Sequence, residues 1–96
     1  MIIKAKTSSK RYKDNILDLD NINLNSLYDL RPVSFTWKNT EKNDFGLIAE
    51  EVSDIIPELV HYENNKPESV AYDKLSVLLL MEIKKLKDEI KQLKEK

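Results

Sequence analysis

The sequence predicts a mixed α+β domain in which short strands and helices precede one long C-terminal helix that forms a parallel coiled coil. Apolar and polar residues alternate over Val33–Trp37, which is typical of a strand. Residues 74–96 contain no helix breaker, and their second half repeats apolar residues at steps of three and four. With 96 residues and no cysteine, the chain forms one core, because two smaller cores would need disulfides or metal sites.

Composition excludes several classes of protein. Charged residues make up 34% of the chain, the net charge is -1, and no apolar run reaches the roughly 20 residues of a membrane span. The first 13 residues hold five Lys and Arg and no acid, which suits a nucleic-acid contact or a solvated arm. Few arginines and a near-zero net charge neutralise few phosphates, so we expect an arm, with no nucleic acid and no membrane as partner.

The first elements are an extended segment and a short helix. Residues 1–7 alternate apolar and lysine side chains, which predicts an extended linker from an upstream domain. Asp20 or Asn21 can cap a helix that Pro32 ends. The apolar positions of this helix recur at helical spacing: Leu24, Leu27, Tyr28 and Leu30.

The middle of the chain predicts a hairpin and a second short helix. After the first strand, the polar residues 39–44 form a loop. Phe45–Ala49 return as a strand around the only glycine, Gly46, which indicates a close backbone approach. Residues 50–56 form a short helix with acids at its start, closed by Pro57.

The last third predicts two extended pieces and the long helix. Residues 59–62 and Val70–Tyr72 are the extended pieces, joined by a loop over Glu63–Glu68. Asp73 caps a helix over residues 74–96, which at 1.5 Å per residue is about 35 Å long.

This helix carries a heptad seam. Beyond its apolar first half, one stripe remains with Ile at a and Leu at d: Leu79, Ile83, Leu86, Ile90 and Leu93. Glu82 and Glu89 occupy g while Lys87 and Lys94 occupy e, so a parallel oligomer pairs opposite charges and an antiparallel one sets like charges together. The alternative is that the stripe packs back on its own domain. Ile at a with Leu at d favours a dimer.

Few residues offer chemistry. The single histidine, His61, stands far from any second ligand type, so we expect no metal and no cofactor. A cluster of hydroxyls and amines remains over Thr7–Lys13. A serine can be activated by a lysine whose amine is neutral, which burial or nearby positive charge favours. On composition alone, such a basic stretch is only a weak indication of catalysis.

Several ordered motifs carry a resemblance to a known family. They are residues 8–16 (SSKRYKDNI), 30–38 (LRPVSFTWK), 46–52 (GLIAEEV), 57–60 (PELV) and 70–72 (VAY). In this order they resemble the C-terminal intramolecular chaperone domains of phage tailspikes, tail fibres and neck appendages. This endosialidase-type family consists of self-cleaving serine-lysine peptidases. The resemblance extends over residues 8–96.

The resemblance implies a domain that follows a trimeric fibre, holds three chains in register while they fold, and then cuts itself off. Residues 1–7 would end the upstream fibre, 8–72 form the globular part, and 73–96 form a parallel trimeric coiled coil. We follow the trimer over the dimer, because packing of the globular part can impose the symmetry. The implied partners are further copies of the chain and its own upstream fibre. The implied location is the host cytoplasm during virion assembly, with release from the mature tail fibre after cleavage.

The resemblance also implies roles for the N-terminal motif. Ser8 is the nucleophile and Lys13 the general base, and the scissile bond lies between Ser8 and Ser9. Arg11 and Asn15 support the loop. The family often has an acid directly after the serine, where this chain has Ser9, and this departure bears on the rate more than on the mechanism.

Two questions stay open at this point. Attack of Ser8 on its own carbonyl would form a strained four-membered ring, so scission after Ser8 needs a hydroxyl from a neighbouring chain, or water. Attack on the carbonyl of Thr7 is a five-membered N-to-O shift and would cut before Ser8. The second question is cleavage itself, since a non-cleaving trimeric cap of a fibre is the alternative function.

Overall fold

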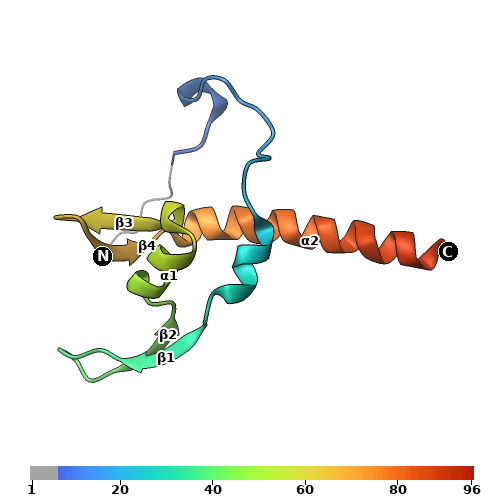
Figure 1. Cartoon of the computed structure of the whole chain (residues 1–96). Helices are drawn as coiled ribbons and strands as arrows, with labels where there is room; N and C mark the ends of the chain where they lie inside the picture. Colours follow the sequence, from blue (N-terminus) through green and yellow to red (C-terminus); the bar gives the residue numbers. More distant parts are fainter. Residues whose placement is uncertain (1–6) are drawn as a thin grey trace.

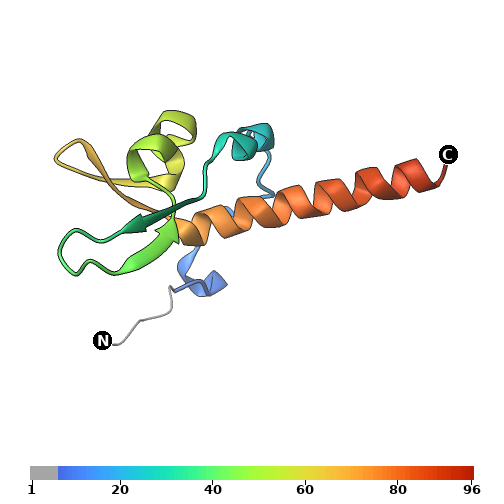
Figure 2. The same ribbon diagram turned by 90° about the horizontal axis from the view of Figure 1, so that it is seen from below.

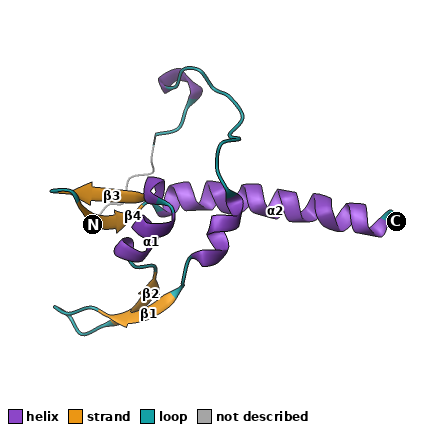
Figure 3. Ribbon diagram, viewed as in Figure 1, coloured by secondary structure: helices purple, strands orange, loops and turns teal. Residues whose placement is uncertain are grey.

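The computed structural model describes residues 7–96 and shows two β-hairpins, a long C-terminal helix and a projecting N-terminal arm (Figure 1). In chain order the elements are the 3-10 helices η1 (Lys10–Tyr12) and η2 (Leu24–Asp29), strands β1 (Val33–Thr36) and β2 (Asn43–Gly46), helix α1 (Ala49–Ile55), 3-10 helix η3 (Pro57–Leu59), strands β3 (Val60–Glu63) and β4 (Lys66–Val70), and helix α2 (Tyr72–Lys94). Short antiparallel strands with one long helix confirm the predicted α+β class (Figure 3). The extended segment expected at residues 1–7 lies, apart from Thr7, outside the described residues.

Within the described residues, the strands form two separate antiparallel hairpins. In the first, β1 pairs with β2 so that Val33 lies opposite Gly46. In the second, β3 pairs with β4 through a register that contains one irregularity. The turn between them is Asn64-Asn65, whose φ angles of 51° and 62° lie in the left-handed region. Asparagine tolerates that region better than most residues, so the turn is short and the second hairpin is tight.

The core lies where α1, η3 and β3 meet the first turns of α2 (Figure 2). Its buried side chains are Leu27, Val52, Ile56, Leu59, Val60 and Leu78. Complete burial of one such side chain stabilises a fold by about 1.5–3 kcal/mol. A core this small favours further apolar burial by association.

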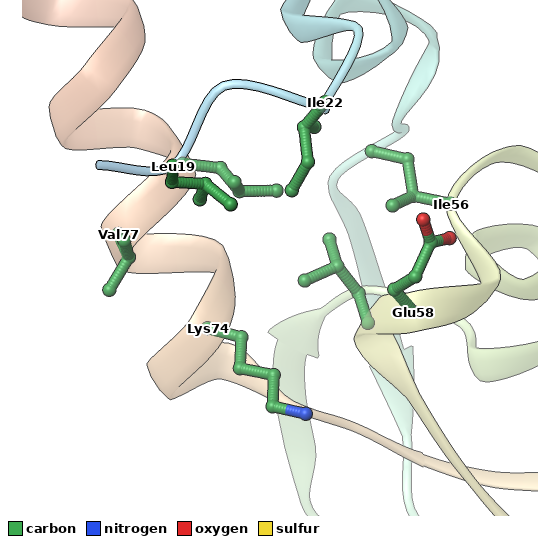
Figure 4. Close-up of a pocket in the computed structure, with 8 residues that line it drawn as sticks. Leu19, Ile22, Ile56, Glu58, Lys74 and Val77 are labelled. Atoms are coloured by element: carbon green, nitrogen blue, oxygen red, sulfur yellow. The ribbon is translucent and has the colours of Figure 1, made fainter. Parts of the chain in front are cut away.

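The helix expected from Asp20 or Asn21 is wrong in its start and its type. The structure has a 3-10 helix, η2, whose N-cap is Asn23, with its Oδ1 accepting from the backbone N–H of Asn25 at 3.1 Å. Residues 14–23 before it have no regular secondary structure and mostly exposed side chains, although Leu19 and Ile22 line a pocket that Ile56 and Val77 also line (Figure 4). Asn, Asp and Ser are frequent here, and their side chains compete with helical backbone hydrogen bonds, which explains the short 3-10 turn.

The first hairpin returns earlier than the sequence predicted. We expected a loop up to Asp44 and a strand over Phe45–Ala49, whereas β2 runs from Asn43 to Gly46. Polar cross-strand hydrogen bonds hold its first two residues in the strand. Thr36 Oγ1 donates to Asn43 Oδ1 at 2.9 Å, and Trp37 Nε1 donates to Asp44 Oδ2 at 3.1 Å.

The strand expected over Val70–Tyr72 is also wrong. The Asn64-Asn65 turn lets β4 begin at Lys66, inside the expected loop, and α2 begins already at Tyr72. The N-cap position of α2 is Ala71 rather than Asp73. Asp73 lies in the first turn, where a carboxylate interacts favourably with the helix dipole.

Helix α2 extends well beyond the globular part (Figure 1). In its first half, Leu78 is buried in the core. The seam residues Leu79, Ile83, Leu86, Ile90 and Leu93 are 40–66% exposed. The stripe therefore does not pack back on its own domain, and it is open to other chains. No helix within residues 7–96 has both the length and the apolar character that a membrane span requires.

Candidate functional site

The candidate site lies on the N-terminal arm, residues 7–18 of the described chain, which loops away from the rest of the fold (Figure 1). A short 3-10 turn, η1, shapes this part of the arm. Ser9 is its N-cap, and the Ser9 hydroxyl accepts hydrogen bonds from the backbone N–H of Arg11 at 3.4 Å and from Arg11 Nη1 at 3.2 Å. The backbone N–H of Lys13 donates to the carbonyl of Lys10 at 3.1 Å and closes the turn.

This turn brings Lys13 back to Ser8. Lys13 Nζ donates a hydrogen bond to Ser8 Oγ at 2.7 Å, across five positions of sequence. A general base must lie about 2.6–3.2 Å from the oxygen whose proton it takes, and this pair meets that condition. Both residues are exposed. The structure therefore places the two expected catalytic side chains in contact, on an open part of the chain.

The two expected supporting residues act on the turn rather than on the dyad. The Arg11 guanidinium bonds to Ser9 and lies 4.6 Å from the centre of the Tyr12 ring, a cation–π contact. Asn15 has a φ of 54°, a left-handed conformation in which asparagine is enriched. It redirects the backbone directly after Lys13 and Asp14.

The sequence did not predict the capping role of Ser9, which was expected to be the far side of the scissile bond and to influence the rate of cleavage. Serine is a preferred N-cap, as are Asp and Asn. The signal was thus present in the residue type.

Other chemically active groups lie elsewhere. His61 is on β3 and exposed. Within residues 7–96, no three His, Cys, Asp or Glu side chains are grouped in a way that could hold a metal ion.

A buried carboxylate on α2 was not expected. Glu82 is only 7% exposed, and the Tyr28 hydroxyl donates a hydrogen bond to its Oε2. Its Oε1 has no hydrogen-bond partner, and Lys85 Nζ lies 4.0 Å away. The hydrogen bond to Glu82 raises the pKa of Tyr28 above its ordinary value, and partial desolvation adds to the rise. Glu82 was expected to face a partner chain at position g, but η2 covers it.

A bidentate ion pair joins two of the sequence motifs. Arg31 Nε donates to Glu51 Oε1 at 3.1 Å and Arg31 Nη2 donates to Glu51 Oε2 at 2.7 Å. These hydrogen bonds lower the pKa of the Glu51 carboxyl below its ordinary value. The pair links the segment directly before β1 to α1.

Comparison with known proteins identifies the class of domain. A family model described as a chaperone of endosialidase, Peptidase_S74, matches residues 8–61. The chain therefore belongs to this family of chaperone domains, which confirms the resemblance found in the sequence. The match begins at Ser8, includes both Ser8 and Lys13, and ends on β3 before α2. No curated protein and no solved structure matches the chain.

Proposed function

We propose that the chain is a C-terminal intramolecular chaperone that brings three copies of an upstream phage fibre or tailspike into register and then releases itself by autoproteolysis at Ser8. The observation that supports the cleavage most directly is the 2.7 Å contact between Lys13 Nζ and Ser8 Oγ, at the start of the family match. The chaperone would act in the host cytoplasm during virion assembly. After the cut, the domain would leave the mature fibre.

The chemistry follows from the two side chains. In the cut before Ser8, the neutral Lys13 amine takes the proton of the Ser8 hydroxyl while that oxygen attacks the carbonyl carbon of Thr7. The bond from this carbon to the Ser8 nitrogen breaks, and the Lys13 ammonium returns the proton to the nitrogen. Water then hydrolyses the ester, which leaves a carboxylate on Thr7 and a free amine on Ser8.

The cut after Ser8 proceeds by direct attack of water or through a second copy, and the second route forms an ester between chains. A Ser8 hydroxyl of one chain attacks the Ser8 carbonyl of another, so the new ester joins two chains and Ser9 gains the free amine. Water hydrolyses this ester in the same way. The two cuts give C-terminal fragments that begin at Ser8 or at Ser9, and their masses differ by one serine residue.

Assembly would complete the site. In a single chain, both Ser8 and Lys13 face solvent, and a lysine acts as a base only in its neutral amine form. A neighbouring copy that covers the arm would exclude water from the amine and favour its neutral form. Cleavage would then report that three chains have come together, and the chaperone would be released only from an assembled fibre.

The chaperone action itself is a matter of effective concentration. Three parallel α2 helices would hold the upstream strands in register, which removes association entropy from a slow, non-local β fold. Once the domain has been cut off, refolding lacks this help, so the mature fibre is kinetically trapped.

A non-cleaving trimeric cap is the second candidate function. The exposure of both dyad side chains in the single chain favours it, because a catalytic lysine normally requires a desolvated environment. In this case the arm would be a structural connection between fibre and cap.

A seam variant tests the proposal. Ile83→Lys with Ile90→Lys adds two charges to the seam, and Asp88→Asn with Gln92→Lys makes the same change of net charge outside it. We expect the parent and the control to sediment as trimers and to lose mass with time, whereas the seam variant is monomeric and is cut at least tenfold more slowly. A monomeric seam variant cut at the parental rate would refute the coupling, and an uncut trimeric parent would favour the cap.

A further inference from the structure

The five seam side chains of α2 are few for a specific interface. Stable interfaces between proteins bury about 800 Å² on each partner, contributed by about 20–30 residues a side. The seam presents Leu79, Ile83, Leu86, Ile90 and Leu93 only. A seam of this size favours a second contact surface outside the coiled coil.

The heptad register points to the place of that surface. Tyr72, the first residue of α2, lies one heptad before Leu79 and so occupies position d. It is 51% exposed. Ser76 occupies the intervening a position and is also exposed, its hydroxyl donating to the carbonyl of Asp73 at 2.7 Å. The line of the seam thus continues to the globular part and reaches the first hairpin.

An apolar groove of about 360 Å³ opens at this point, between the β1–β2 hairpin and the first turn of α2. We call it the hairpin groove, and its main lining residues are Pro32, Val33, Phe45, Leu47, Tyr72 and Leu75. None of its lining residues is charged, although 34% of the chain is charged. Aromatic enrichment and depletion of charge are typical of the centre of a protein interface.

Phe45 is the most informative member of the groove. Its side chain is 82% exposed, although it belongs to a paired strand, opposite Ser34. An exposed phenylalanine gains little stabilisation from burial within its own chain, and it leaves apolar surface in contact with water. Two elements distant in sequence, β2 and α2, thus present aromatic rings to the same side.

We propose that the hairpin groove is the globular half of the subunit interface and that its occupant is a second copy of this chain. Phe45 of one copy lies against the groove of the next copy. This contact is at the height of Tyr72, whose d position adds one more layer to the coiled coil. This inference rests on the proposed parallel assembly, which sets the Tyr72 side chains of all copies at one height. Around a closed ring each copy gives one Phe45 and receives one, so the hairpin rather than the a and d residues sets the number of chains.

This assignment accounts for the conflict over oligomer number. Ile at a with Leu at d favours two strands, and two heptads are a weak determinant by themselves. A contact between hairpin and groove fixes the angle between neighbouring copies. That angle determines the symmetry of the oligomer, and therefore the number of α2 helices in the coiled coil.

The first test uses Phe45→Thr, with Leu17→Thr on the arm as matched control. Both parent side chains are more than 80% exposed, at 82% and 85%, so neither change removes packing within the chain. In sedimentation equilibrium we expect Phe45→Thr to weaken association at least tenfold or to change the number of chains, with unchanged helical circular dichroism. Leu17→Thr should associate within threefold of the parent.

The results separate this inference from the proposed function. If Phe45→Thr associates like the parent while Ile83→Lys with Ile90→Lys is monomeric, the groove inference is wrong and the coiled coil stands. If Phe45→Thr assembles normally but is no longer cut, the groove binds the upstream segment instead of a second copy. A monomeric parent would overturn both.

A second measurement keeps an aromatic ring at position 45. Protein that carries a photo-reactive benzophenone side chain at this position is unfolded together with ¹⁵N-labelled parent, refolded so that the oligomers contain both forms, and irradiated. We expect cross-linked peptides that join the two isotopic forms and contain Tyr72 or Leu75. Cross-links confined to one isotopic form would contradict a second copy in the groove.

Discussion

A methyl group added at Gly46 would lie 2.8 Å from the hydroxyl oxygen of Tyr72. That hydroxyl accepts a hydrogen bond from the backbone N–H of Leu47 at 2.9 Å. The only glycine of the chain thus stands where β2 passes the first residue of α2. The sequence indicated a close approach of backbone at this point, and what approaches is a tyrosine side chain.

Gly46→Ala is therefore expected to destabilise the protein by about 0.5–1.5 kcal/mol, because the Tyr72 hydroxyl must move and lose the hydrogen bond from the backbone N–H of Leu47. Urea unfolding at fixed protein concentration measures the change. Tyr72→Phe removes the clashing oxygen and leaves only contacts of 3.7 Å or more. The double variant should then lose less stability than the sum of the two single variants, and strict additivity would argue against the contact.

Tyr28 makes stability depend on alkaline pH. Its pKa in the folded state is raised, chiefly by the hydrogen bond to Glu82, so the folded state holds its proton more tightly than the unfolded state does. This contribution to stability is complete below about pH 10, the ordinary value, and is lost as the pH rises through the raised pKa. Tyr28→Phe should flatten the fall in unfolding free energy above pH 10.

Ultraviolet absorbance at alkaline pH checks the same claim directly. The difference between the tyrosinate titrations of the parent and of Tyr28→Phe should show a group that titrates above the ordinary tyrosine range. Tyr12→Phe, on the exposed arm, is the control. A Tyr28 that titrates at the ordinary value would show that Glu82 does not accept its hydroxyl in solution.

Ser9 should control the rate of cleavage through the η1 turn. Loss of a serine N-cap costs about 1 kcal/mol, which corresponds to about a fivefold smaller population of the turn that presents Lys13 to Ser8. We expect Ser9→Ala to slow cleavage several-fold and Ser9→Asp, which restores a capping oxygen, to recover the parental rate. Equal rates for Ser9→Ala and the parent, followed by intact mass over time, would exclude this role.

The features that local sequence determines were predictable. The seam of α2 follows from residues three and four positions apart on one helix, and all five seam side chains are exposed as one stripe. The first strand follows from alternation over Val33–Trp37, and β1 covers most of it. The Ser8–Lys13 contact was expected from the family resemblance, and a turn of only three residues, η1, produces it.

The features that depend on distant residues were not predictable. The sequence around Glu82 predicts an exposed helix position, but Glu82 is buried and accepts a hydrogen bond from Tyr28, 54 residues earlier in the chain. Residues 43 and 44 are polar, and their polarity predicts a loop. In the structure they belong to β2 and accept hydrogen bonds from the side chains of Thr36, on β1, and Trp37, directly after it. Periodicity reports one face of one element and contains no information about what lies opposite.

The most direct test of the central claim is intact-mass spectrometry of the parent beside Ser8→Ala, Lys13→Ala and Lys13→Arg. Arginine keeps the charge and can still donate to Ser8, but it cannot act as a neutral base. The account predicts that the parent alone loses its N-terminal fragment, leaving a chain that begins at Ser8 or Ser9. Cleavage of any of the three variants at the parental rate, or a trimeric parent that keeps its full mass, would contradict a self-cleaving dyad.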